Sequence, residues 1–130
     1  MLDWVSKPSI FADLHGPLLG PDGWLYFCDG HNGHSVTVAD GTRWEGKAAC
    51  VYRCRTDGSG LEVVFGGGMD NPVEVIFTPE GEMLVSCNLI MARPQRQDGI
   101  VYGIEGGVYP YDACISEFKR TGDLLKPVGG

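Results

Sequence analysis

The chain contains 130 residues, of which 43% are hydrophobic and 20 are glycine, and its formal net charge is −7. This composition argues against wholesale disorder, and the length fits one domain, 1–130. No apolar run approaches the roughly 20 residues of a membrane helix, so no membrane span is expected, and the first residues lack the pattern of a signal peptide. The longest basic cluster is Lys119 with Arg120, so no nucleic-acid partner is expected either.

Short apolar runs alternate with turn signals along the whole chain. Each run is rich in β-branched or aromatic side chains, which is typical of strands. The turn sequence TDGSG at 56–60 predicts a hairpin, and the alternation within 51–55 is typical of a half-exposed strand. No helical stripe of useful length occurs, so the predicted class is all-β. In chain order, the expected strands are 24–27, 50–55, 61–65, 73–77, 83–86 and 115–119.

The five cysteines form no CxxC motif. Cys50 and Cys54 would point to the same face of one strand, about 13 Å apart, which is too far for a disulfide bond. We therefore expect the cysteines to be small apolar fillers rather than metal ligands. The full set is Cys28, Cys50, Cys54, Cys87 and Cys114.

An internal repeat is visible in the sequence. The segment GPDGWLYF at 20–27 aligns with TPEGEMLV at 78–85, 58 residues further on. A repeat of 40–60 residues that carries several strands is the signature of a β-propeller blade. The sequence therefore predicts about two blades of four-stranded antiparallel sheet, at 10–65 and 66–125. Because propellers close with about four to eight blades, we expect this to be a partial β-propeller.

Four segments carry a resemblance to a known family: GPDGWLYF, VYRCRTDGSGLEVV, NPVEVIFTPEGEMLV and DGIVYGIEGGVYPY. They resemble the propeller of glucose/sorbosone dehydrogenase-like proteins, and more closely that of planctomycete-type membrane-bound dehydrogenases. The resemblance covers roughly residues 10–125. It implies a fragment of an exported, periplasmic oxidoreductase that acts on a sugar or polyol. It also implies a haem-binding cytochrome domain in the intact protein, with no turnover by this chain alone.

The resemblance also implies site residues. In the quinoprotein sugar dehydrogenases of this superfamily a catalytic His precedes the GPDG turn, which points to His15 as the base. A loop after the next strand and an Asn-Pro segment contact pyrroloquinoline quinone, which binds with calcium. The matching positions here are His31, Asn32 and Asn71. His31 stands where the family has a carboxylate, and Asp70 stands where it has an arginine.

The residues themselves leave alternatives open. His15 and Asn71 would also suit turns that bond to backbone groups. In the segment CDGHNGH at 28–34, Asp29, His31 and His34 would form an open three-ligand metal site. The same segment would equally suit a solvated glycine-rich turn.

Two other functions remain open. One is a non-catalytic binding or interaction propeller of the NHL type, with 30–33 as a recognition edge. The other is a lactonase-like metal-dependent hydrolase, to which Asn71, Glu74 and Asn88 would contribute. Residues 92–99 are expected to form a polar connection between strands, and the tryptophans to fill space between blades rather than to bind sugar.

Overall fold

The computed structural model describes residues 3–6, 14–30, 34–38, 40–46, 49–66, 69–90 and 96–107. Within these residues every regular element is a β-strand, which confirms the all-β class. The expected strand at 115–119 and Cys114 lie outside the described residues. The strands are β1 (Asp3–Ser6), β2 (His15–Leu19), β3 (Leu25–Asp29), β4 (His34–Thr37), β5 (Arg43–Gly46), β6 (Cys50–Cys54), β7 (Glu62–Gly66), β8 (Asn71–Phe77), β9 (Met83–Ile90) and β10 (Arg96–Gly103).

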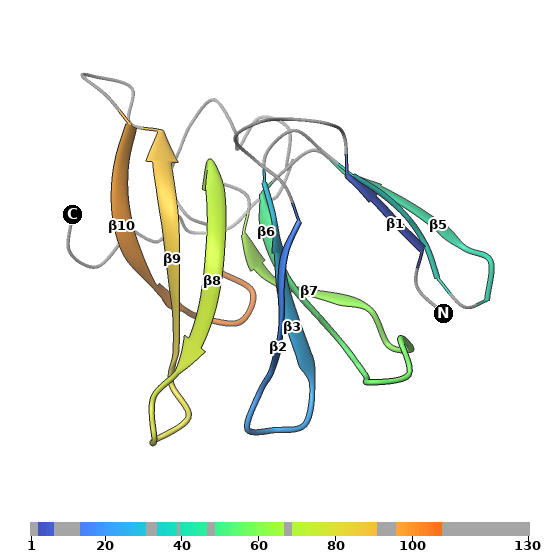
Figure 1. The fold of residues 1–130 in the computed structure, drawn as a ribbon, viewed down its shortest axis with the longest axis horizontal. Coiled ribbons are helices and arrows are strands. Elements are labelled where there is room, and N and C mark those ends of the chain that lie inside the picture. Colours follow the sequence, from blue (N-terminus) through green and yellow to red (C-terminus); the bar gives the residue numbers. More distant parts are fainter. Residues whose placement is uncertain are drawn as a thin grey trace.

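The strands form three antiparallel sheets. The central sheet has the order β2-β3-β6-β7, and the two flanking sheets have the orders β10-β9-β8 and β1-β4-β5. Figure 1 shows the central sheet between the other two. The β4–β5 hairpin is an insertion, because the strands that precede and follow it, β3 and β6, pair directly with each other.

The inner strands of the central sheet, β3 and β6, are buried on both faces, whereas β2 is largely exposed. On one face, Val51 and Phe65 pack in a cluster with Val85 of β9 and Val101 of β10. On the other, Tyr52 packs in a cluster with Val36 of β4. The prediction of a half-exposed strand at 51–55 was therefore wrong: within β6 all residues but Arg53 are buried, because a sheet covers each face.

Four hairpin turns share one geometry. In the first, the Gly20 N–H donates to the Trp24 carbonyl at 2.8 Å, and the Gly23 N–H donates to the Gly20 carbonyl at 3.0 Å. The same two bonds recur in turns 38–42, 55–59 and 78–82. The turn at 55–59 confirms the hairpin predicted from TDGSG. Each is a type I turn closed by a glycine with positive φ, such as Gly58 at 84°. Residues with a side chain rarely adopt this backbone conformation.

The sequence repeat has a counterpart in the strand pairing. Leu18 lies opposite Tyr26 in the β2–β3 hairpin, and Ile76 lies opposite Leu84 in the β8–β9 hairpin. Both members of the second pair are 58 residues after those of the first. Each hairpin also has an irregularity in its first strand, before this pair. The two hairpins are thus copies in register.

Residues 92–99 were expected to form a polar connection, and for 96–99 this was wrong. β10 begins at Arg96 and pairs with β9 over its whole length. The first residues of β10 are polar, so they lack the apolar pattern that predicts a strand. An edge strand of a sheet with one open face needs few apolar residues. Asp98 is exposed on that face and accepts a hydrogen bond from Asn88. Strands β1, β2, β4 and β5 are likewise absent from the strands expected from the sequence.

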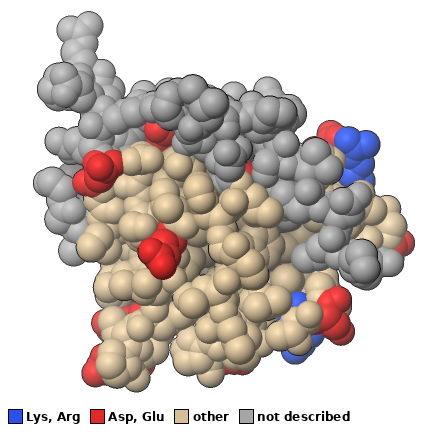
Figure 2. Space-filling view, in the orientation of Figure 1, with Lys and Arg blue, Asp and Glu red and all other residues tan. Residues whose placement is uncertain are grey.

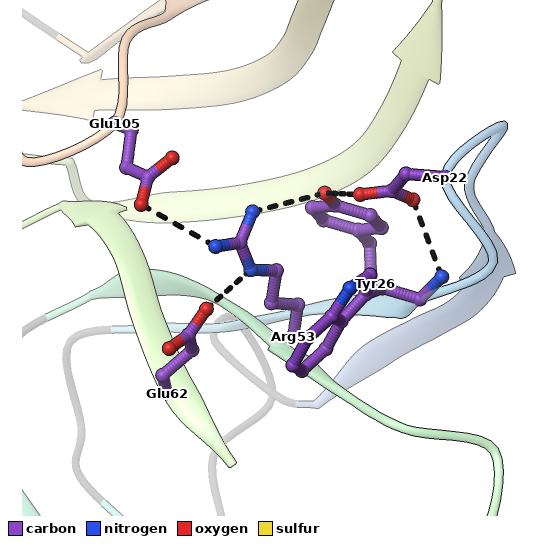
Figure 3. A network of polar contacts seen from close by, with 6 residues as sticks. Asp22, Tyr26, Arg53, Glu62 and Glu105 are labelled. Atoms are coloured by element: carbon purple, nitrogen blue, oxygen red, sulfur yellow. Dashed lines mark hydrogen bonds and ion pairs between the residues drawn. The ribbon is translucent and has the colours of Figure 1, made fainter. Parts of the chain in front are cut away.

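An arginine network links the central sheet to the β8–β10 sheet (Figure 3). Arg53 donates to Glu62 at 2.5 Å, to the Tyr26 hydroxyl at 3.5 Å and to Glu105, which follows β10, at 3.3 Å. The Tyr26 hydroxyl donates to Asp22 at 2.7 Å. The Glu105 carboxylate is largely exposed, so its contact contributes little to stability.

The surface in the view of Figure 2 is largely uncharged over the described residues. Acidic side chains are spread singly, and the basic ones lie near the margin. No helix long and apolar enough to cross a membrane occurs among the described residues.

The described cysteines are buried and form no disulfide bond with one another, as expected of apolar fillers. Burial raises the pKa of Cys28 and of Cys87 to about 12. Both thiols therefore stay protonated in the folded protein at pH values where they ionise in the unfolded chain.

We predict that Cys28 and Cys87 resist iodoacetamide at pH 8 in the folded protein and react once it is denatured. Mass spectrometry of the labelled peptides measures this directly. The raised pKa of each thiol also makes the free energy of unfolding fall at alkaline pH. The contribution of each thiol to stability is fully present below the unfolded thiol pKa of about 8.5 and is lost as the pH rises toward 12. Rapid labelling of either residue in the folded chain would contradict the packing between the sheets.

Candidate functional site

The predicted site residues lie at the ends of strands opposite the hairpin turns. His15 and Asn71 begin β2 and β8, whereas Asp29 ends β3 and His34 begins β4. Because each turn closes the other end of its hairpin, these residues share one end of the sheets, uppermost in Figure 1. His31 and Asn32 lie outside the described residues.

A pocket of about 250 Å³ lies between the central sheet and β8. β2 contributes residues 15–18, β3 contributes 26–28 and β8 contributes 73–75. The ionisable side chains in the lining are those of His15, Tyr26, Cys28 and Glu74. The remainder of the lining is mainly apolar, a composition typical of small-molecule sites.

Among the side chains that line this pocket, His15 is the best suited to bind a ligand or to accept a proton from it. Its Nε2 atom is buried and has no hydrogen-bond partner among the described residues. A buried polar atom without a hydrogen bond lowers folding stability by about 1–3 kcal/mol. Such atoms are rare in native proteins, and a functional role is one explanation for them. A ligand hydroxyl in the pocket would supply the missing partner.

The local backbone positions His15. It lies opposite Cys28 of β3, and the pairing shifts between His15 and Leu18. Gly16 has φ 110°, and a Cβ there would lie 3.1 Å from Phe27 Cβ. The absence of a side chain at Gly16 thus lets β2 lie close beside its neighbour β3, next to His15, whose imidazole lines the pocket.

Asp29 and His34 form a separate, buried cluster with Tyr52. His34 Nδ1 lies 2.6 Å from Asp29 Oδ2, so the ring N–H donates to the carboxylate. The Tyr52 hydroxyl lies 3.2 Å from His34 Nε2. Burial raises the pKa of Tyr52, so its hydroxyl is a neutral donor. Asp29, His34 and Tyr52 are each at most 5% exposed, which excludes the solvated turn considered for 28–34 at Asp29 and His34.

The structure brings together two of the three expected metal ligands and separates them from His15. Asp29 and His34 contact each other on the face of the central sheet that carries β4. His15 faces β8 across the opposite face. The described residues contain no group of three His, Cys, Asp or Glu side chains able to hold a metal ion.

Asn71 is the first residue of β8. Its Oδ1 is buried without a hydrogen-bond partner in the part of the chain that the structure describes, and its Cα lies opposite that of Asn88. Glu74, which the sequence suggested only for a hydrolase, lines the pocket instead. Its signal in the sequence was a charged residue inside the apolar run 73–77.

The described residues around this pocket do not fit pyrroloquinoline quinone, which carries several carboxylates. No described Lys or Arg side chain lines the pocket, and Glu74 places a carboxylate there. Arg43 pairs with Glu45, and Arg55 lies over the Trp24 ring. An anionic quinone would thus meet like charge without a compensating cation.

Comparisons with family models, with curated proteins and with solved structures found no match. The site itself is therefore the basis for inferring function.

Proposed function

We propose that the chain is part of a β-propeller of the sugar or polyol dehydrogenase type, and that the pocket beside His15 binds the sugar or polyol. Two features support the propeller: the β2–β3 and β8–β9 hairpins are copies in register, and their sheets pack face to face. The open face of the β8–β10 sheet, with Ile76 and Ile100 about half exposed, would take the next blade.

The single observation that carries the binding function is the unpartnered Nε2 of His15. A substrate hydroxyl would donate a hydrogen bond to this atom, and Glu74 would accept one from a second hydroxyl. The side chains of Leu18, Val73 and Val75 would contact the C–H groups of the ligand. A neutral polyhydroxylated molecule satisfies all three requirements, whereas an anion would be repelled by Glu74.

The chemistry available to this chain is proton acceptance by His15 from the bound hydroxyl. Oxidation of the substrate would also need a two-electron acceptor, and none of the described residues supplies one. We therefore expect this chain to bind without turnover. In the intact protein, a haem-binding cytochrome domain would be the partner that receives the electrons.

We predict that His15→Leu weakens binding of D-glucose or D-sorbitol at least tenfold while leaving the chain folded. Because the substitution removes an unsatisfied buried nitrogen, stability should stay equal or increase. Calorimetric titration measures the affinity. In a thermal melt, ligand at 100 times its dissociation constant adds about 2.7 kcal/mol, a shift of several degrees.

Glu74→Gln gives a second variant at an exposed position, and Ile104→Ala is the matched control away from the pocket. Equal affinity of wild type, His15→Leu and Glu74→Gln would refute the pocket as the binding site. Absence of wild-type binding to any sugar or polyol would refute the ligand class.

A non-catalytic binding propeller is the second candidate, and the poor fit of the quinone favours it. Both candidates predict that His15→Leu weakens binding. They differ in a dye-reduction assay on the intact protein with sugar present, in which only the dehydrogenase reduces the dye.

A further inference from the structure

A second cavity, of about 300 Å³, lies at the hairpin-turn end of the molecule, away from His15. The β4–β5 turn forms one side, and residues 58–61 after β6 form the other. Its lining combines apolar and polar side chains: Val38, Trp44 and Leu61, with Asp40, Thr42 and Ser59. None of the functions considered so far uses this cavity.

Trp44 gives the cavity an aromatic wall. Its indole is only partly buried and packs against the cluster that contains Leu61. Trp24 differs, because the guanidinium groups of Arg55 and Arg53 lie over its ring at 4.6 and 5.1 Å. Of these two tryptophans, Trp44 lines this cavity and Trp24 does not.

Asp40 gives the cavity a fixed acceptor. Its Oδ1 accepts a hydrogen bond from the Thr42 N–H at 2.8 Å. Hydrogen bonding to Thr42 also holds the pKa of this carboxyl below its usual value, so Asp40 is ionised at neutral pH. No described Lys or Arg side chain lines the cavity. The charge therefore disfavours anions, and the lining suits a ligand with hydroxyl donors.

We propose that this cavity binds one ring of a neutral saccharide. The C–H face of the ring stacks on the indole of Trp44, and the ring hydroxyls donate to Asp40 and exchange hydrogen bonds with Ser59. Aromatic side chains suit this task because they offer a flat apolar surface beside polar groups. The site is independent of the His15 pocket and lies at the opposite ends of the strands.

The test is a titration of the chain with methyl glucoside, followed by saturation-transfer NMR on the sugar C–H protons. Asp40→Asn and Trp44→Ala should each weaken this binding at least tenfold. Asp22→Asn is the matched control, because Asp22 accepts a hydrogen bond from the Trp24 N–H in the equivalent turn at 20–24 but does not line the cavity. Asp40 is exposed, so Asp40→Asn keeps the test valid if Trp44→Ala fails to fold.

His15→Leu separates the two sites: binding that persists in this variant and is lost in Asp40→Asn supports the second site. Binding that is unchanged in Asp40→Asn, or lost only in His15→Leu, overturns it. Choline chloride is a further probe, because a cation would also suit an indole beside a carboxylate. Saturation by choline with no binding of the glucoside overturns the saccharide proposal.

Discussion

Replacing Phe65 by alanine should lower the free energy of unfolding by about 3–5 kcal/mol. Phe65 is fully buried on β7, in the cluster that joins the central sheet to the β8–β10 sheet. A Cβ added at Gly103 of β10 would lie 2.9 Å from its ring, so the β10 backbone runs close beside it. Alanine would leave a cavity that the surrounding sheets cannot fill without moving.

Urea denaturation followed by fluorescence measures the effect. Leu19→Ala is the control, because Leu19 is 60% exposed, and surface substitutions usually change stability by within about 0.5 kcal/mol. Equal denaturation midpoints for Phe65→Ala and wild type would show that the two sheets do not pack together in solution. A gradual, non-cooperative transition already in the wild type would show that the chain needs further blades to fold.

Replacing Asp29 by alanine should lower the free energy of unfolding by about 3–5 kcal/mol. The substitution removes the carboxylate that accepts the hydrogen bond from the buried ring of His34. The carboxylate is 1% exposed and accepts from His34 Nδ1 at 2.6 Å. It also joins two sheets, since Asp29 ends β3 and His34 begins β4.

A double-mutant cycle with His34→Ala isolates the pair. Contacting residues give coupling energies of about 0.5–3 kcal/mol, so the double variant should be less destabilised than the two single effects combined. Glu80→Ala, in an exposed turn, is the control for removing a carboxylate. Additive effects would show that the Asp29–His34 contact does not contribute to stability.

The buried Asp29–His34–Tyr52 cluster and the His15 pocket suggest a division of roles between the two faces of the central sheet. The cluster anchors the inserted β4–β5 hairpin, because His34 begins that hairpin while Asp29 and Tyr52 belong to the central sheet. The pocket is formed on the face toward β8. Substitutions in the cluster should therefore change stability first, whereas substitutions in the pocket should change binding.

The sequence by itself determined the class of fold, most of the core strands and the hairpin turns. Local signals are sufficient for these features. A glycine with positive φ closes each of four turns, and Asp57 bonds to Ser59 within the predicted TDGSG turn. The repeat was also readable, because a copied hairpin keeps its turn and its register together.

Only the tertiary structure decided which face each functional side chain occupies. Cys28 and Asp29 are neighbours in sequence, but successive residues of a strand point to opposite faces. Cys28 therefore lines the pocket with His15, whereas Asp29 contacts His34 in the other layer. The long-range packing of three sheets buried β6 on both faces and placed Glu74 and His15 in the lining of one pocket. Alternation along one strand cannot reveal what covers each face, because that depends on strands far away in the sequence.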